Sequence, residues 1–304
     1  MDYDCAIKGE NISKKFKTFT LDIPEFKVPK GFATALIGEN GAGKTTLLNM
    51  LSGIRLDYNG ELTFFDKYSS NEKEKRSDVK NKIGYTGTGR YYLPQWTVAD
   101  IEEISSLLFD NFDRDEFRRY CRELAIFPDF PDGFAPKKKC SALSDGTRTK
   151  LMLAGVMARD TDLLLLDEPA SPLDPLMRDK LCQMIGDYIN DGAGEKSVLF
   201  STHNISDMES ITDYAIIMEH GNVVECGFVE DLKEKYILIK GDAQDAEAAS
   251  KILYTMTKNP YGFEGICLAE NLDKLAGMNV SKEIASLFQI SVAVMKNNTK
   301  LVMR

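Results

Sequence analysis

The residues from Gly38 to Thr45, GENGAGKT, place glycines, a lysine and a threonine at the spacing G-x-x-x-x-G-K-[ST]. Glycines at such positions let the backbone turn tightly and direct successive N–H groups toward phosphate oxygens. Lys44 can add a positive charge beside the β- and γ-phosphates, and the Thr45 hydroxyl can bind Mg²⁺. The pattern therefore predicts a loop that binds a nucleoside triphosphate. The alternative is a turn that leads into a core helix.

Two acids and a histidine follow apolar segments further along the chain. Asp167 and Glu168 end the run LLLLDE, and His203 follows SVLFST. We expect Asp167 to hold Mg²⁺ through water and Glu168 to orient or deprotonate an attacking water. His203 is predicted at the carboxyl edge of a sheet, where it can hydrogen-bond a γ-phosphate. The alternatives are two solvated carboxylates and a structural histidine.

Strands and helices must position these residues. Turn signals between short apolar runs over residues 3–37 predict antiparallel strands that lead into one buried strand, ATALIG, and the phosphate loop then opens a helix. The all-apolar run before Asp167 is typical of a parallel strand buried on both faces. Residues 98–158 favour helices, and residues 214–227 favour a hairpin. After about residue 230, the pattern predicts a strand, a helix, a strand and a helix.

The composition indicates an ordinary globular protein. The chain has 304 residues, 43% hydrophobic and 28% charged, enough for a sizeable core in one large domain or two unequal ones. Its net charge of -9 argues against nucleic acid as a partner. Six scattered cysteines favour free thiols in a reducing compartment. Because the N-terminus is polar and no apolar run approaches ~18 residues, we expect a cytosolic chain that needs another chain to cross a membrane.

Five motifs occur in order along the chain: GENGAGKTT, LSDGT, LLLLDEP, SPLD and STH. This set resembles the nucleotide-binding subunit of ATP-binding cassette (ABC) transporters, over about residues 3–228. The resemblance implies an α/β fold, a P-loop ABC ATPase cassette with a mixed sheet core, an antiparallel β subdomain and an α-helical subdomain, plus a small C-terminal α+β domain. We expect the cassette over residues 1–230, its helical subdomain over about 89–158, and the accessory domain over 231–304.

The resemblance also implies that ATP and Mg²⁺ are the ligands and assigns roles to single positions. In the family, the motif LSDGT of one subunit docks on the γ-phosphate of ATP held by the other, and SPLD links the two sites. The implied catalytic residues are Glu168, His203 and Lys44, and the implied metal-site residues are Thr45, Asp167 and Thr88. The implied nucleotide-binding residues are Phe16, Gly38, Asn40, Gly41, Ala42, Gly43, Lys44, Thr45, Thr46, Ser144, Gly146 and Asp174.

Some positions are open to another interpretation or depart from the family pattern. Phe16 matches the aromatic residue that stacks on adenine; the alternative is a core aromatic. Asp145 is third in LSDGT, where the family has glycine or a basic residue, and an acid there should repel a triphosphate unless it points away. Thr147 is fifth, where Gln or Met is usual. Thr88 replaces the usual Gln or acid, which puts contact with Mg²⁺ from that loop in doubt.

Within the family, the chain is similar to ATPases paired with ABC-2-type permeases, including exporters of bacteriocins and phenol-soluble modulins. The resemblance implies an exporter motor for peptides or toxins that pairs head-to-tail with a second copy or a paralogue around two Mg-ATP. It implies an integral-membrane ABC-2-type permease as partner, at the cytoplasmic face of the membrane. Tyr91 and Tyr92 lie where the family's permease docks; core packing is the alternative. The other functions left open are a soluble ABC ATPase, an import ATPase and a regulatory module that does not hydrolyse ATP.

Overall fold

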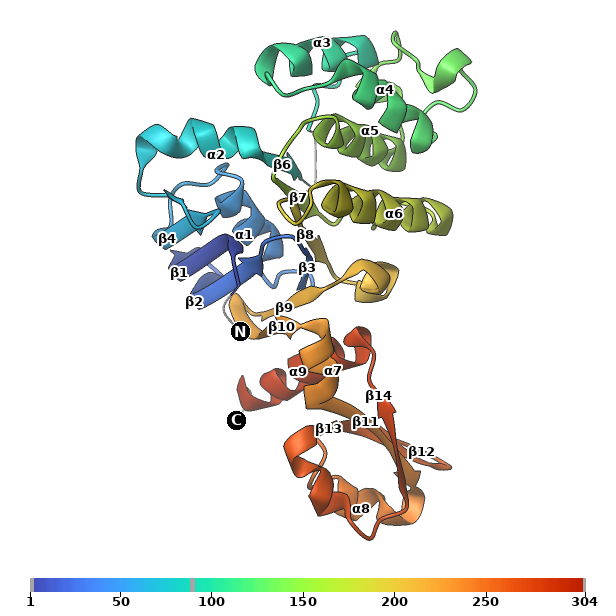
Figure 1. The fold of residues 1–304 in the computed structure, drawn as a ribbon. Coiled ribbons are helices and arrows are strands. Elements are labelled where there is room, and N and C mark those ends of the chain that lie inside the picture. Colours follow the sequence, from blue (N-terminus) through green and yellow to red (C-terminus); the bar gives the residue numbers. More distant parts are fainter. Residues whose placement is uncertain (1–2, 88–90, 303–304) are drawn as a thin grey trace.

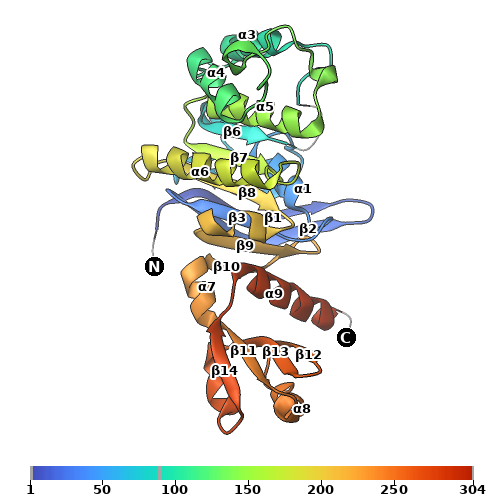
Figure 2. The same ribbon diagram turned by 90° about the vertical axis from the view of Figure 1, so that its right-hand side faces the viewer.

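Three β-sheets organise the part of the chain that the structure describes (Figure 1). The computed structural model describes residues 3–87 and 91–302, with side chains as far as residue 298. A six-stranded mixed sheet lies at the centre, and four-stranded antiparallel sheets form from the N-terminal and C-terminal parts. In both views, helices α3 (Val98–Leu108), α4 (Arg114–Glu123) and α5 (Asp145–Met157) lie at one end of the molecule and the C-terminal sheet lies at the other (Figure 2).

The central sheet accounts for the all-apolar runs of the sequence. Its strand order is β10-β9-β3-β8-β7-β6, with every neighbouring pair parallel except β9 and β10. Along β7, Leu163 and Leu165 pack on the side of helix α1 (Lys44–Leu51), while Leu164 and Leu166 pack on the side of α6 (Pro175–Asp191). The predicted parallel strand with two buried faces is therefore confirmed. The strands are β3 (Ala33–Ile37), β6 (Ile83–Thr86), β7 (Leu163–Asp167), β8 (Ser197–Thr202), β9 (Tyr214–Glu219) and β10 (Asn222–Phe228).

The N-terminal sheet has the order β2-β1-β4-β5 and packs with α1 on one face of the central sheet. Local sequence signals set the helix starts in the α-helical part. The Thr97 side chain accepts from the Asp100 N–H and the Asp100 side chain accepts from the Thr97 N–H, which forms a capping box before α3. At α4, the Asp113 side chain is a simple N-cap that accepts from the N–H groups of Asp115 and Glu116. The remaining elements of this half are β1 (Cys5–Lys15), β2 (Thr20–Pro29), β4 (Asn59–Phe64), β5 (Tyr68–Ser69) and α2 (Arg76–Lys82).

The C-terminal part contains two more strands than the sequence pattern predicts. Its sheet has the order β12-β13-β11-β14, with antiparallel pairs throughout. Strand β14 is exposed along most of its length, so it lacks the alternation of apolar and polar residues that reveals a half-buried strand. The elements are α7 (Val229–Lys235), β11 (Tyr236–Asp242), α8 (Ala246–Ala249), β12 (Thr255–Asn259), β13 (Gly262–Leu268), β14 (Val280–Ile284) and α9 (Leu287–Val302).

Helix α9 joins the C-terminal sheet to the central sheet. Ile290 and Val294 of α9 share one apolar core with Leu238 of β11 and Ile217 of β9. At the start of α9, the Leu287 N–H donates to Glu209 at 2.8 Å. Since α9 packs on both sheets, the division into residues 1–230 and 231–304 stays a prediction. Within the described ranges, no helix has the length and apolar character needed to cross a membrane.

Candidate active site

The phosphate loop connects the buried strand β3 to helix α1. Gly41 and Gly43 adopt φ values of 89° and 106°, in the left-handed region where glycine is strongly favoured. At Gly38, a Cβ would lie 2.5 Å from the carbonyl oxygen of Met218. The shape of the loop thus depends on its glycines. Helix α1 begins at Lys44, so its N-terminal N–H groups face an anion bound in the loop.

Lys44 is buried in this loop, with 6% of its side chain exposed. Its ammonium lies 2.6 Å from the carbonyl oxygen of Gly38, 3.2 Å from that of Glu39 and 3.3 Å from a carboxylate oxygen of Glu168. A buried charge requires such partners because its desolvation is costly. The structure therefore holds a cation at the centre of the loop, in contact with two carbonyl oxygens and the Glu168 carboxylate.

Two oxygen ligands for a metal meet beside the loop. Thr45 Oγ1 donates to Asp167 Oδ2 at 2.8 Å, and Ser201 Oγ donates to Asp167 Oδ1 at 2.6 Å. Asp167 and Ser201 are paired residues of the parallel strands β7 and β8, so the sheet register sets their contact. A hydroxyl and a carboxylate are hard ligands of the kind Mg²⁺ prefers, and Mg²⁺ usually keeps several waters besides. Thr45 and Asp167 therefore fit a magnesium ion, which when bound would supply positive charge to neutralise the phosphates.

Glu168 lies between the Lys44 ammonium and the imidazole of His203. One carboxylate oxygen is 3.3 Å from Lys44 Nζ, and the other is 2.8 Å from His203 Nδ1. The backbone of Glu168 has a φ of 51°, an uncommon conformation for a residue with a side chain, and its N–H is 2.9 Å from Ser201 Oγ. No sequence motif predicts a role for Ser201, because the register of β7 and β8 that pairs it with Asp167 is set by the fold. Its hydroxyl positions both acids.

The motif LSDGT forms the N-terminus of helix α5. Ser144 is the N-cap and accepts from the Thr147 N–H at 3.2 Å. At Gly146, a Cβ would lie 2.9 Å from the carbonyl oxygen of Pro172, so the helix tip packs closely on the SPLD loop of the same chain. The Asp145 carboxylate forms an ion pair with Arg148 Nη1 of the same chain at 2.7 Å. This pairing reduces the repulsion of a triphosphate that the sequence predicts for Asp145.

A cleft of about 560 Å³ is lined both by the two acids and by residues of the first turns of α5. Tyr85 lies near this cleft and donates to Asn49 Oδ1 at 2.9 Å. Burial, with a smaller contribution from the nearby Asp167 charge, raises the pKa of Tyr85 to about 12, so its hydroxyl remains a donor at neutral pH. The cleft residues include Asn40, Thr86, Asp145, Arg148, Asp167, Glu168, Ser171 and His203.

Phe16 is outside the three apolar cores of the described residues, next to Phe19, which packs against the core of the N-terminal sheet. Its ring is half-buried, 5.9 Å from the ring of Phe19 between centroids and 5.2 Å from the Arg55 guanidinium. An accessible aromatic face of this kind can stack on a base. Of two other predicted nucleotide-binding residues, Ala42 lies buried in the loop and Thr46 lies half-buried in the first turn of α1.

Of the remaining predicted residues, the structure describes Asp174, Tyr91 and Tyr92. Asp174 is the N-cap of α6, where its side chain accepts from the Met177 N–H at 3.1 Å. Thr88 lies outside the described residues. Tyr92 packs against the core of the α-helical part, whereas Tyr91 is 41% exposed.

Comparison with known proteins gives one family for this arrangement. Residues 21–171 match the family described as ABC transporter. An energy-coupling factor transporter ATP-binding protein, EcfA2 of Lactococcus lactis subsp. cremoris, is 28% identical over 222 residues, which are 71% of this chain and 74% of that protein. An uncharacterized ABC transporter ATP-binding protein of Nostoc sp. is 28% identical over 287 residues, which are 90% of this chain and 83% of that protein.

Solved structures share the fold. An ATP-binding subunit of an ABC transporter superposes with a TM-score of 0.63 at 21% identity, covering 75% of this chain and 92% of that chain. The dimeric cassette MJ0796 superposes with a TM-score of 0.61 at 20% identity, covering 73% and 98%. The predicted cassette fold is confirmed by these likenesses. The family match and the relatives show that the chain carries an ABC transporter ATP-binding cassette and is an ATPase that uses ATP with Mg²⁺.

Proposed function

We propose that the chain is the ATP-hydrolysing motor subunit of a membrane transporter whose membrane-spanning part is a separate permease. The observation that carries the proposal is the convergence of Lys44, Glu168 and His203, with distances of 3.3 Å and 2.8 Å between successive groups. Together with Thr45 and Asp167, they supply a phosphate cation, metal ligands and a base within one cleft.

In this proposal, the chain's own residues divide the work of hydrolysis. Lys44 moves from Glu168 to the β- and γ-phosphates when ATP enters the loop. Glu168, released from the ammonium, accepts a proton from the attacking water. His203 holds the Glu168 carboxylate through Nδ1 and can contact the γ-phosphate with its other nitrogen. Thr45 and Asp167 hold Mg²⁺.

A second ATPase cassette completes the site. The hydroxyl of Ser144 and the N–H groups at the tip of α5 are anion-binding groups, and Gly146 keeps that tip free of a side chain. We propose that they bind the γ-phosphate of ATP held by a second copy or a paralogue, with Asp174 in the loop between the two sites. ATP then joins the pair, and hydrolysis releases it.

The proposed direction of transport is supported by the relatives and not by the site. The initial interpretation was an exporter of the ABC-2 branch with a peptide or toxin as cargo. Several relatives are named as energy-coupling factor transporter ATP-binding proteins, which are of the import type. These names favour the import alternative, and we propose uptake as the direction.

The face around the end of α2 is proposed as the docking surface for the permease, which would place the chain at the cytoplasmic side of the membrane. The Arg159 guanidinium connects the end of α2 to the segment after α3. It donates to the carbonyl oxygens of Lys80 and Asn81 and lies 3.8 Å from the ring centroid of Phe109. Large apolar side chains are exposed on the neighbouring segments after α1 and at the end of α3. These are Ile54 (63%), Leu56 (52%), Leu107 (75%) and Leu108 (67%).

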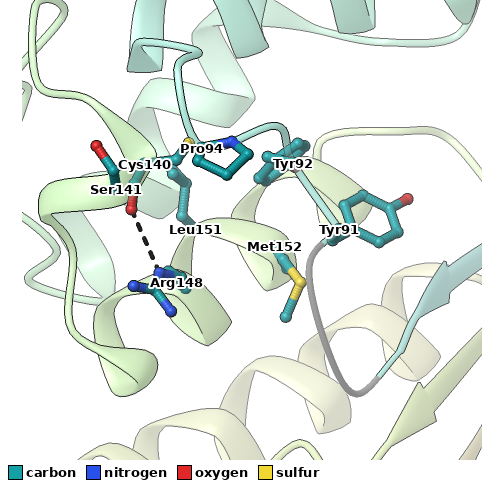
Figure 3. A pocket seen from close by; sticks show the side chains of 8 residues that line it. All are labelled: Tyr91, Tyr92, Pro94, Cys140, Ser141, Arg148, Leu151 and Met152. Atoms are coloured by element: carbon teal, nitrogen blue, oxygen red, sulfur yellow. Dashed lines mark hydrogen bonds between the residues drawn. The ribbon is translucent and has the colours of Figure 1, made fainter.

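We propose that the docking surface also includes a groove beside α5, which Tyr91 borders (Figure 3). Its cavity of about 180 Å³ is bordered by Tyr92, Pro94 and Leu151, and Arg148 Nε donates to the Cys140 carbonyl oxygen at 3.3 Å across it. Because Arg148 also pairs with Asp145 at the tip of α5, a segment seated in this groove would touch the residue that supports the nucleotide-binding tip.

Affinity purification from detergent-solubilised membranes tests the proposal. We expect an integral-membrane protein to co-purify with the tagged chain and Tyr91→Asp to reduce its recovery. The matched control is Tyr261→Asp, since Tyr261 is 92% exposed on the C-terminal sheet. Recovery of no integral-membrane protein with the wild-type chain, although the tagged chain retains its ATPase activity, would reject the proposed role as a motor.

A further inference from the structure

Arg178 connects two loops that flank the active site. It lies in the first turn of α6, just after the SPLD loop. Its Nε donates to the carbonyl oxygen of Leu173 in that loop at 2.9 Å, and its Nη1 pairs with Asp207 Oδ1 at 2.7 Å. Asp207 ends the 3₁₀ turn Ile205–Asp207, which follows His203 after one residue.

From Asp207, the contacts continue to the catalytic histidine. The other carboxylate oxygen of Asp207 accepts from Asn204 Nδ2 at 3.1 Å, and the Asn204 N–H donates to Thr202 Oγ1 at 3.0 Å. Asn204 is the neighbour of His203, whose Nδ1 is 2.8 Å from Glu168. Hydrogen bonds and one peptide link therefore run from the SPLD loop to Glu168.

We propose that Arg178 is a positioning residue for ATP hydrolysis, which couples the SPLD loop to the orientation of His203. This inference rests on the proposed roles of Glu168 and His203. The Arg178 and Asp207 side chains are 29% and 20% exposed, so solvent screens their contact less than a surface pair. A planar guanidinium can hold a carbonyl and a carboxylate at once in fixed geometry, whereas a lysine ammonium is a flexible point charge.

Loss of this link should change turnover and spare ATP binding. Displacing a catalytic group by about 1 Å can lower a rate about a hundredfold, so we expect Arg178→Met to lower kcat about tenfold to a hundredfold. The nucleotide loop and Phe16 are untouched, so KM and the Kd for Mg-ATP should stay within about twofold. Arg178→Lys keeps a cation for Asp207 but lacks the Nε–H that reaches Leu173, and we expect an intermediate kcat.

Lys180→Met is the matched control. Lys180 lies on the same helix and pairs with Glu123 at 3.2 Å, on the side of α4. Its removal takes away a cation from α6 without touching either loop, so kcat should remain that of the wild type. Asp207→Asn should lower kcat as much as Arg178→Met, and the double variant should lose little more, because both changes break the same link.

The experiment measures kcat and KM by phosphate release, Kd with a fluorescent ATP analogue, and unfolding by circular dichroism. A lower kcat with unchanged KM and Kd in a folded variant supports the proposal. Wild-type kcat, or equal losses of kcat and of binding, overturns it. Should Arg178→Met fail to fold, Arg178→Lys and Asp207→Asn decide by the same criteria. Glu168→Gln is measured in parallel: its full turnover would reject the proposed site itself, whereas an inactive Glu168→Gln beside a fully active Arg178→Met rejects this inference alone.

Discussion

The substitution Glu168→Gln should separate ATP binding from hydrolysis and move them in opposite directions. Glutamine keeps the shape of the side chain but removes the base and its negative charge. Loss of a positioned general base typically lowers a rate by about 10² to 10⁴, and we expect kcat to fall within that range. ATP binding should become tighter, because Lys44 no longer has to break an ion pair with Glu168 before it contacts the phosphates.

The contact between Lys44 and Glu168 sets the size of the binding effect. At their separation of 3.3 Å, Coulomb's law gives roughly 5 kcal/mol with an effective dielectric constant of about 20. Desolvation offsets most of this attraction, and Lys44 keeps the carbonyl oxygens of Gly38 and Glu39 in either variant. We expect a remainder of about 1 to 2 kcal/mol, which corresponds to about tenfold tighter binding of Mg-ATP.

Phosphate release and titration with a fluorescent ATP analogue test these two effects on one preparation. Glu264→Gln, on the exposed side of strand β13, changes the net charge equally far from the site and serves as control. Weaker ATP binding in Glu168→Gln would refute the Lys44 argument. A kcat within threefold of the wild type would refute Glu168 as the base.

Three further predictions concern adenine, the metal and the helix tip. Phe16→Ala should weaken ATP binding by about 1 to 3 kcal/mol if the ring stacks on adenine, while Phe16→Trp should retain binding; equal Kd values for all three proteins would exclude stacking. Thr45→Val should abolish the Mg²⁺ dependence of ATP affinity, whereas Thr45→Ser keeps the hydroxyl and should not; calorimetry with and without EDTA distinguishes them. Asp145→Gly should tighten nucleotide-driven pairing of cassettes severalfold, because in the proposed pair Asp145 is an acid that faces the neighbour's triphosphate. The ion pair between Asp145 and Arg148 is exposed, so its loss should change the free energy of unfolding by less than about 1 kcal/mol. Unchanged or weaker pairing in sedimentation would contradict that expectation.

Sequence patterns were sufficient for the elements buried on both faces. The run before Asp167 is entirely apolar, the segment ATALIG has Thr34 as its one polar residue, and both form fully buried parallel strands. The turn at His220 and Gly221 joins β9 and β10 with φ values of 48° and 84°, a left-handed pair that suits a tight hairpin. Strand β14 was missed because an exposed edge strand has no apolar side to detect.

The site could be predicted where its chemistry lies within one motif. Gly38 to Thr45 form the loop that the spacing required. Contacts between motifs depend on strand register and loop geometry, which a linear pattern does not contain. This is why the support that Ser201 gives to Asp167 and the link from Arg178 to Asp207 became visible only in the structure. The pair of Asp145 and Arg148 could have been anticipated, since residues three apart in a helix are neighbours.

Sedimentation of the Glu168→Gln protein tests most directly whether two cassettes enclose ATP between the Lys44 loop and the Ser144 helix tip. With Mg-ATP, the account predicts that the mass doubles, that Mg-ADP leaves it single, and that adding Ser144→Arg prevents doubling while ATP binding persists. A sedimenting mass that stays the same with and without Mg-ATP would contradict the account. So would an ATP-dependent dimer that still forms when Ser144→Arg is present.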